Sequence, residues 1–270
     1  MERRIFLKEF GPNLKRNEQG WFILPDDVSW RKSIFPEQCM KHPAKMQMYL
    51  EQAIYQYVSE PGDILLDPMS GSGTLMIAAL EGRTVITIDI ESEFHEWQKM
   101  AYEHIKLSYP DMSPCIQIHG NCKLLLPITC NHIIFSPPYG SAFKPPKKLT
   151  GIMADKYRVD ESNFNIYAKT TGNVGIQNTF LYNQTMEKVY RLCYESLLPG
   201  GTMSVVTKDI TEKGKRVYLT DWINRVCHQI GFKDLLWIKT EQMGGPWQDI
   251  RRSKGLPTVD DEDTIIYRKE

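Results

Sequence analysis

The sequence lacks three features that would each restrict its function. It has no excess of charge, since 33 acidic residues balance 33 basic ones over 270 residues. It has no apolar run long enough to cross a bilayer, and the N-terminal MERRIFLKEF has no uncharged apolar core of the signal-peptide kind. Balanced charge gives no global basic field, so any attraction for a polyanion must come from local clusters. Because neither a bilayer-spanning run nor a signal-peptide core is seen, we expect a cytoplasmic protein without a membrane segment.

Paired cysteines are also missing. The six cysteines are scattered, and no CxxC pair occurs: Cys39, Cys115, Cys122, Cys130, Cys193 and Cys227. This pattern argues against a zinc knuckle and suits a reducing compartment. We expect no metal site and interpret the six thiols as structural or incidental.

What is present is ordinary for a globular protein, with 41% hydrophobic and 24% charged residues and no internal repeat. The length fits one large α/β domain over residues 1–270 better than two domains. Within it, residues 1–35 lack sustained periodicity and are expected to form an arm over the domain. Residues 141–178 are expected to be an inserted loop, because they are long, polar and irregular.

The strongest local signal is DPMSGSGT at residues 67–74, between an apolar run at 64–66 and an amphipathic run at 75–80. This order predicts a strand, a glycine turn and a helix. Glycines at 71 and 73 can take positive φ and carry no Cβ, so the backbone can approach a ligand closely. The N–H groups of a helix that begins at Thr74 would face the same ligand. The turn therefore predicts a site for a small polar molecule.

An acid follows about one strand later, where TVITIDI ends on Asp89 and Ile90. An open α/β sheet usually places the acid that binds a ribose diol at the carboxyl end of such a strand. Turn and acid together predict a nucleoside pocket.

Three motifs together resemble one family. DPMSGSGT, with KHPAKM before it and SPPYG after it, resembles the DNA amino-methyltransferases, which use S-adenosylmethionine to methylate the exocyclic amine of cytosine or adenine. The resemblance extends from Phe35 to Trp237. It implies the class I methyltransferase fold, an α/β fold with a seven-stranded, mostly parallel, doubly wound sheet and a terminal antiparallel strand pair. It also implies a cofactor site made of Lys45, Asp67, Pro68, Met69, Ser70, Gly71, Ser72, Gly73, Thr74, Asp89, Ile90 and Asn121.

Two of these cofactor residues have competing interpretations. By resemblance, Lys45 or the start of its helix would lie near the methionine carboxylate, but a lysine whose stem covers a core helix explains it equally well. Asn121 either meets the adenine ring or is a turn residue after Gly120.

Hydrophobic periodicity predicts the remaining elements. Helices are expected at 42–58, 92–107, 180–198 and 220–230, and strands at 115–119, 132–135, 202–207, 232–238 and 264–268, the last two paired antiparallel. The turn Pro199-Gly200-Gly201 is expected to end the third of these helices.

The tetrapeptide at residues 136–139 suits the chemistry of the family. An exocyclic amine is a poor nucleophile because its lone pair is delocalised, and its attack on a methyl sulfonium requires pyramidalisation. Ser136 Oγ and the Pro137 carbonyl can accept hydrogen bonds from the amine, while Pro137 and Pro138 remove competing backbone donors. Tyr139 offers a face on which a base rotated out of the duplex can stack. Without the cofactor turn, a proline-rich turn at a strand end would be the simpler interpretation.

The loop after this tetrapeptide interleaves basic and aromatic residues: Lys144, Lys147, Lys148, Lys156, Arg158 and Lys169 with Phe143, Tyr157, Phe164 and Tyr167. This pattern favours contact with DNA phosphates and bases over a merely solvated loop. The motif order leaves no room for a large recognition domain. Base specificity must then come from this loop, from the loop at 244–254, or from a partner chain.

Serine at the head of the tetrapeptide favours cytosine N4 over adenine N6, because SPPY leans toward cytosine in this family. Two other functions stay open, an RNA base methyltransferase and a catalytically silent nucleic-acid-binding subunit. Two departures from the family pattern are Met69, where an aromatic residue is usual, and Asn131, near where an Asp often precedes the fourth strand.

Overall fold

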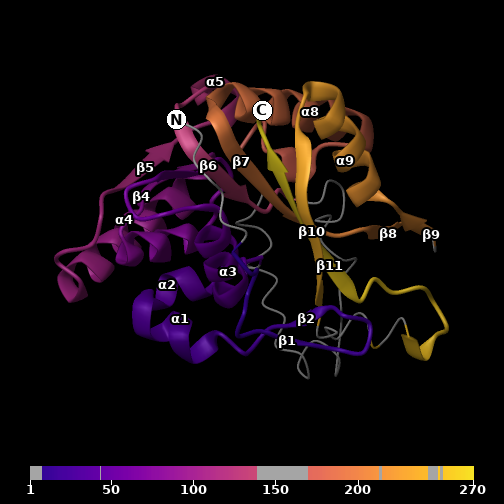
Figure 1. The fold of residues 1–270 in the computed structure, drawn as a ribbon, viewed down its shortest axis with the longest axis horizontal. Coiled ribbons are helices and arrows are strands. Elements are labelled where there is room, and N and C mark those ends of the chain that lie inside the picture. The colour runs from indigo at the N-terminus through magenta and orange to yellow at the C-terminus, as the bar shows by residue number, and fades with distance from the viewer. Residues whose placement is uncertain (1–7, 43, 139–169, 213–214, 243–248, 250–251) are drawn as a thin grey trace.

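A computed structural model of the chain describes residues 8–42, 44–138, 170–212, 215–242, 249 and 252–270. Its main sheet has the strand order β1-β2-β10-β11-β7-β6-β3-β4-β5 (Figure 1). The strands are β1 (Lys15–Arg16), β2 (Phe22–Ile23), β3 (Ile64–Asp67), β4 (Thr84–Asp89), β5 (Cys115–His119), β6 (Cys130–Phe135), β7 (Leu197–Thr207), β10 (Lys233–Glu241) and β11 (Asp261–Arg268).

Seven of these strands form the expected arrangement. Strands β5, β4, β3, β6 and β7 are parallel, and β11 is antiparallel to both β7 and β10. The doubly wound sheet with an antiparallel β10–β11 pair is confirmed. Two short N-terminal strands extend it beyond β10, where Phe22 of β2 pairs with Thr240.

Helices cover both faces of the sheet (Figure 1). They are α1 (Val28–Ile34), α2 (Glu37–Met40), α3 (Met48–Val58), η1 (Thr74–Glu81), α4 (Ser92–Ser108), α5 (Cys122–Leu125), η3 (Val174–Ile176), α8 (Thr179–Ser196) and α9 (Leu219–Ile230). A hairpin of β8 (Ile210–Glu212) and β9 (Lys215–Val217), which the sequence did not predict, stands apart from the main sheet.

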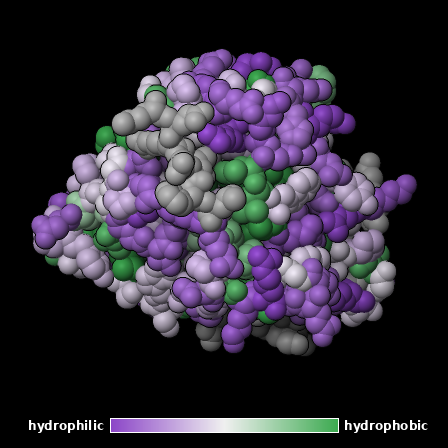
Figure 2. Space-filling model, in the orientation of Figure 1, coloured by the Kyte–Doolittle hydropathy of each residue, from purple (hydrophilic) through white to green (hydrophobic). Residues whose placement is uncertain are grey.

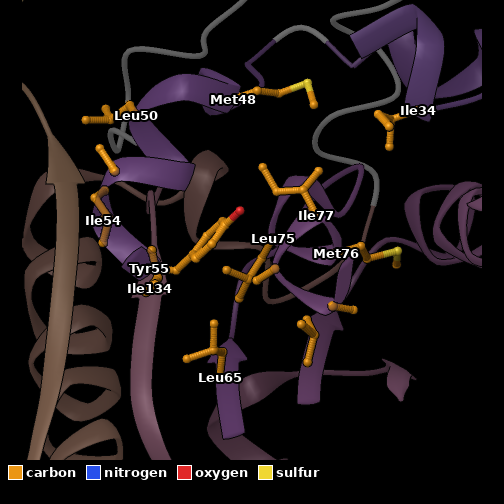
Figure 3. Close-up of a cluster of buried hydrophobic side chains, with 14 of the residues drawn as sticks. Ile34, Met48, Leu50, Ile54, Tyr55, Leu65, Leu75, Met76, Ile77 and Ile134 are labelled. Atoms are coloured by element: carbon orange, nitrogen blue, oxygen red, sulfur yellow. The ribbon is translucent and has the colours of Figure 1, made fainter. Parts of the chain in front are cut away.

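Consecutive strand residues supply two separate hydrophobic cores, because side chains alternate between the faces of a strand. Leu65 and Ile134 pack with α3, η1 and α4, as Figure 3 shows for Leu65, Ile134, Leu75 and Ile77. Their neighbours Leu66 and Ile133 pack with α8 and α9 on the opposite face. Continuous apolar strands buried on both sides explain why the sequence reads as a parallel sheet.

Two helix boundaries and one helix type differ notably from the expectation. The helix predicted at 42–58 begins only at Met48, because the Gln47 side chain accepts a hydrogen bond from Leu50 N and caps the helix there. The helix at Thr74 begins as predicted but is a 3-10 helix, bounded by Gly73 and Gly82 at positive φ.

The helix predicted at 180–198 ends at Ser196, and the segment Pro199-Gly200-Gly201 lies inside β7 rather than between helix and strand. A Cβ on Gly201 would stand 2.4 Å from the carbonyl oxygen of Asn131 on β6. That glycine is therefore required by close strand packing rather than by a helix stop.

The described residues of the arm predicted over residues 1–35 include β1, β2 and α1. Phe10 and Phe22 pack into the core with ring centroids 5.4 Å apart. The visible face of the molecule is mostly polar, with hydrophobic residues gathered near its centre (Figure 2). Among the described residues, the structure has no helix with the length and apolarity to cross a membrane.

Candidate active site

A cavity lies where β3, β4 and β6 end, with about 830 Å³ of empty space that includes the solvent at its open mouth. Small-molecule sites are typically concave and have a few convergent polar groups, as this cavity does. Its walls include most residues that the sequence nominated: Lys45, Asp67, Pro68, Met69, Ser70, Gly71, Ser72, Thr74, Asp89, Ile90, Asn121, Ser136 and Pro138. Gly73 and Pro137 do not line it, and Tyr139 lies outside the described residues. The cofactor turn and the SPP segment thus share one cavity.

The pairing of strands brings these two motifs together. Leu66 of β3 pairs with Ile133 of β6, so the parallel strands carry Asp67 and Ser136 to the same edge of the sheet. Ser136 is partly exposed, whereas Pro137 and Pro138 are buried. A serine hydroxyl is therefore open to a ligand at the end of a strand that adjoins the cofactor turn.

The turn itself is held by side chains from α4 and β4. Gln98 Nε2 donates hydrogen bonds to Ser70 Oγ and to the Gly71 carbonyl oxygen. Ser70 Oγ in turn donates to the Ile88 carbonyl oxygen. Gly71 and Gly73 take φ values of +52° and +82°, which confirms the need for glycine at both positions.

Asp89 joins the turn to the end of β4. Its Oδ2 accepts a hydrogen bond from Gly71 N at 2.7 Å, and its Oδ1 accepts one from Glu91 N at 2.9 Å. Each carboxylate oxygen has a further lone pair, so these bonds leave acceptor capacity for two hydroxyl groups. Burial raises the pKa of Asp89 to about 7.

Two further acids lie at the floor of the cavity. Asp67 Oδ1 accepts a hydrogen bond from Met69 N, and burial raises the pKa of Asp67 to about 8. Glu51, on α3, is fully buried, and neither of its carboxyl oxygens has a hydrogen-bond partner among the described residues. Burial and then the charge of Asp67 raise the pKa of Glu51. Sequence reasoning did not nominate Glu51, because it lies on the apolar face of a predicted helix and belongs to no motif. The only sequence signal for it is a charged residue on a face that is otherwise apolar.

The two ambiguous residues have internal partners. Lys45 Nζ donates hydrogen bonds to the carbonyl oxygens of Met40 and His42, so this lysine links the HPAK sequence (residues 42–45) to Met40. Burial lowers the pKa of Lys45 to about 8. Asn121 caps α5 by accepting a hydrogen bond from Lys123 N. Both side chains nevertheless line the cavity.

Glu91 brings the end of the long loop to the cavity. Its carboxylate accepts hydrogen bonds from the hydroxyl of Thr170 at 2.7 Å and from the side-chain amide of Asn173 at 2.7 Å. Gly172, Asn173 and Val174 line the cavity with it. Sequence reasoning missed this contact because its partners are about 80 residues apart and belong to no motif.

The residues that line the cavity fit an adenosyl cofactor that carries an amino acid. Within the described part of the chain, both carboxyl oxygens of Glu51 lack a hydrogen-bond partner. Gly71 leaves space where an added Cβ would stand 2.6 Å from His42 Nε2. Buried acids at the end of β4 and at the floor match hydroxyl and ammonium groups. The described residues thus provide both the space and the acceptors.

Comparison with known proteins gives two sequence matches. Residues 5–103 match the family model of N6 and N4 methyltransferases, described as DNA methylase. Over 94 residues, the chain is 35% identical to the Type II methyltransferase M2.MboI of Moraxella bovis. This match covers 34% of the present chain and 33% of the relative, so it spans about a third of that relative's length.

Solved structures extend the likeness to the whole fold. A SAM-dependent methyltransferase from Methanosarcina mazei aligns with 84% of this chain and 99% of its own, at 12% identity and a TM-score of 0.51. TrmN from Thermus thermophilus aligns with 86% of this chain and 52% of its own, at 15% identity and a TM-score of 0.49. The first of these shows the class I methyltransferase fold.

The sequence matches and the fold agree. Over residues 5–103 the chain is similar to the N6 and N4 DNA methyltransferases, its fold is that of a class I methyltransferase, and both likenesses indicate S-adenosylmethionine as the cofactor.

Proposed function

We propose that this protein transfers the methyl group of S-adenosylmethionine to the exocyclic amine of a base in DNA, with cytosine N4 favoured over adenine N6. The observation that carries the proposal is that the SPP segment and the cofactor turn line one cavity at neighbouring strand ends. A cofactor site alone would suit any methyltransferase. The serine and prolines beside it suit an amine acceptor.

The cofactor would lie on residues 67–74, with its ribose on Asp89 and its adenine near Ile90 and Asn121. When bound, it supplies an electrophilic methyl group on a sulfonium. Lys45 is proposed near the methionine carboxylate, to which it has one N–H left to donate, because two of its three are already used.

At the acceptor, Ser136 Oγ and the Pro137 carbonyl oxygen would accept hydrogen bonds from the two N–H groups of the base. These bonds favour the pyramidal amine and so act mainly in the transition state. Tyr139 would stack against the base, which must leave the duplex because its amine cannot be reached inside the stack.

DNA would be held by the basic and aromatic residues of the loop at 141–178, all of which lie between positions 143 and 169, outside the described residues. The Glu91 contacts support this assignment, since they tie Thr170 and Asn173, near the end of that loop, to the cavity. Sequence specificity would come from this loop, from the loop at 244–254, or from a partner chain. The similarity to a Type II methyltransferase supports a role in restriction-modification.

The direct test is incubation with duplex DNA and S-adenosylmethionine, digestion to nucleosides and identification of the product by mass spectrometry. N4-methylcytosine is expected. N6-methyladenine would overturn the choice of base, and a product in RNA alone would favour an RNA methyltransferase. No methyl transfer to any nucleic acid would favour a silent binding subunit.

The roles in the chemical step are tested by single-turnover methylation with saturating cofactor. Ser136→Ala should lower the rate on the order of a hundredfold, as loss of a preorganised polar group does elsewhere, with little change in DNA or cofactor binding. Tyr139→Phe should keep most activity, while Tyr139→Ala should weaken base capture. A control is Ser108→Ala at the end of α4, away from the cavity. A Ser136→Ala variant as fast as the parent would refute the proposed acceptor.

A further inference from the structure

One carboxyl group in the cavity has no assigned task. Glu51 lies in the first turn of α3, is fully buried and lines the same cavity as Asp67. Both of its carboxyl oxygens lack a hydrogen-bond partner within the described part of the chain. A buried carboxyl group without a partner is costly, whether it is ionised or protonated. The fold would gain by replacing it with an apolar side chain unless a ligand satisfies it.

The nearby cations are engaged elsewhere. Arg31 is close enough for its charge to favour the ionised form of Glu51, but its guanidinium donates to Thr74 Oγ1, Asp27 Oδ2 and the Met46 carbonyl oxygen. Lys45 donates to the carbonyl oxygens of its own loop. The other charge that acts on Glu51 is the carboxylate of Asp67, which repels it. Asp67 in turn interacts with the charge of Asp89. The floor of the cavity is therefore acidic and has room for a cation.

We propose that Glu51 binds the α-ammonium group of the cofactor's methionine moiety and so selects a cofactor with an intact amino acid end. This inference rests on the proposed cofactor pocket and assigns a residue outside its sequence motifs. The sulfonium is the other cation of the cofactor, but it has no N–H or O–H to donate. An ammonium has three donors and can satisfy both oxygens of Glu51.

The position of Glu51 also supports the ammonium group as its ligand. Glu51 comes from α3, which packs against η1 and β6, and η1 begins at Thr74, the end of the cofactor turn. The acid that is assigned to the ribose, Asp89, comes instead from the end of β4. The two acids thus approach the cavity from different elements, as the two ends of an extended cofactor require.

Calorimetric titration with three ligands tests the inference without any methyl transfer. S-adenosylhomocysteine carries the ammonium and the carboxylate, its desamino analogue keeps only the carboxylate, and 5′-methylthioadenosine lacks both. The parent should bind S-adenosylhomocysteine at least tenfold more tightly than the desamino analogue. Glu51→Gln, which keeps the shape and removes the charge, should lose most of this preference. Its affinity for 5′-methylthioadenosine should stay within twofold of the parent.

Two variants at position 51 distinguish a loss of the ligand contact from misfolding. Glu51→Gln and Glu51→Met should both unfold at or above the parent's temperature without ligand, since each removes an unpaired buried acid. Glu96→Gln on α4, at an exposed site paired with Lys99, is the matched control and should bind all three ligands as the parent does. Unchanged preference for S-adenosylhomocysteine in both Glu51 variants would overturn the inference. An equal loss of affinity for all three ligands would also overturn it. If the parent binds none of the three, the proposed cofactor pocket itself is wrong.

Discussion

A Cβ added to Gly71 would stand 2.6 Å from Nε2 of His42. The cofactor turn therefore packs directly against the loop that carries the HPAK motif. Burial lowers the pKa of His42 to about 3, so the ring that closes this contact is neutral. The two motifs, at residues 42–45 and 67–74, have 21 residues between them and together form one wall of the cavity.

Gly71→Ala should destabilise the protein and weaken cofactor binding together. At Gly62, φ is +93° and no atom lies within 4 Å of an added Cβ, so Gly62→Ala measures the backbone strain alone, about 1 kcal/mol. Gly71→Ala should cost at least about 1 kcal/mol more, because it also displaces His42. Urea unfolding of both variants gives the difference. Equal costs would mean that His42 moves aside freely.

Asp89→Ala should lower cofactor affinity at least tenfold, since a charge-assisted contact to hydroxyls contributes about 1.5–3 kcal/mol. The same change removes the acceptor for Gly71 N and Glu91 N, so it also loosens the turn. Asp89→Asn separates these effects, because one oxygen stays available to accept. It should bind more tightly than the alanine variant and less tightly than the parent. Binding by Asp89→Ala that matches the parent in calorimetry would exclude Asp89 from the pocket.

In the ligand-free protein, the contribution of Asp67 and Asp89 to the free energy of unfolding should fall as pH rises from about 4 to about 8. Burial raises their pKa values to about 8 and about 7, from an ordinary 3.8, so the folded state binds more protons than the unfolded state in this interval. Stability then falls by up to about 1.4 kcal/mol per pH unit for each proton.

The variant Asp67→Asn isolates this effect. Relative to the parent, it should gain stability as pH rises from about 4 to 8, and Asp111→Asn at an exposed site should not. Saturating S-adenosylhomocysteine should reduce the gain, because its ammonium favours the ionised acids. A parent-to-variant difference that is constant with pH would show that Asp67 titrates normally in the folded protein.

Replacing Lys144, Lys147 and Lys148 by Gln should weaken DNA binding and leave cofactor affinity unchanged. Each lost phosphate contact lowers the slope of log affinity against log salt concentration by nearly one. A triple variant at Lys99, Lys188 and Lys233, which are exposed on other elements, is the control and should keep the parent slope. A parent slope in the loop variant would mean that these lysines are only solvated.

The sheet could be predicted from the sequence because its signals are local. Consecutive apolar residues such as Leu65 and Leu66 pack into two different cores, and the glycines of the turn have conformations that other residues rarely adopt. The start of α3 was placed too early because apolar spacing continues past the capping residue Gln47, and a cap is a single hydrogen bond.

The site was predictable only where it forms motifs. Asp67, Asp89 and Ser136 follow apolar strands, and strand ends in a parallel sheet meet at one edge. Glu51 and Glu91 depend on tertiary contacts, one with Asp67 and the other with Thr170 and Asn173. No spacing rule relates those partners. The roles of Ser136, Tyr139 and the loop lysines remain predictions.

All six cysteines are buried, and burial raises the pKa of Cys39, Cys115 and Cys130 to about 12. Alkylating reagents attack thiolates, so these thiols react only when the surrounding structure opens. Cys122 differs, because it also lines the cavity. Its rate of alkylation should fall when a ligand occupies that cavity, while Cys193 and Cys227, on α8 and α9, do not line the cavity and should follow only the opening of the core that they share with Cys122. The native chain therefore contains a site-resolved chemical probe of ligand occupancy that needs no introduced label.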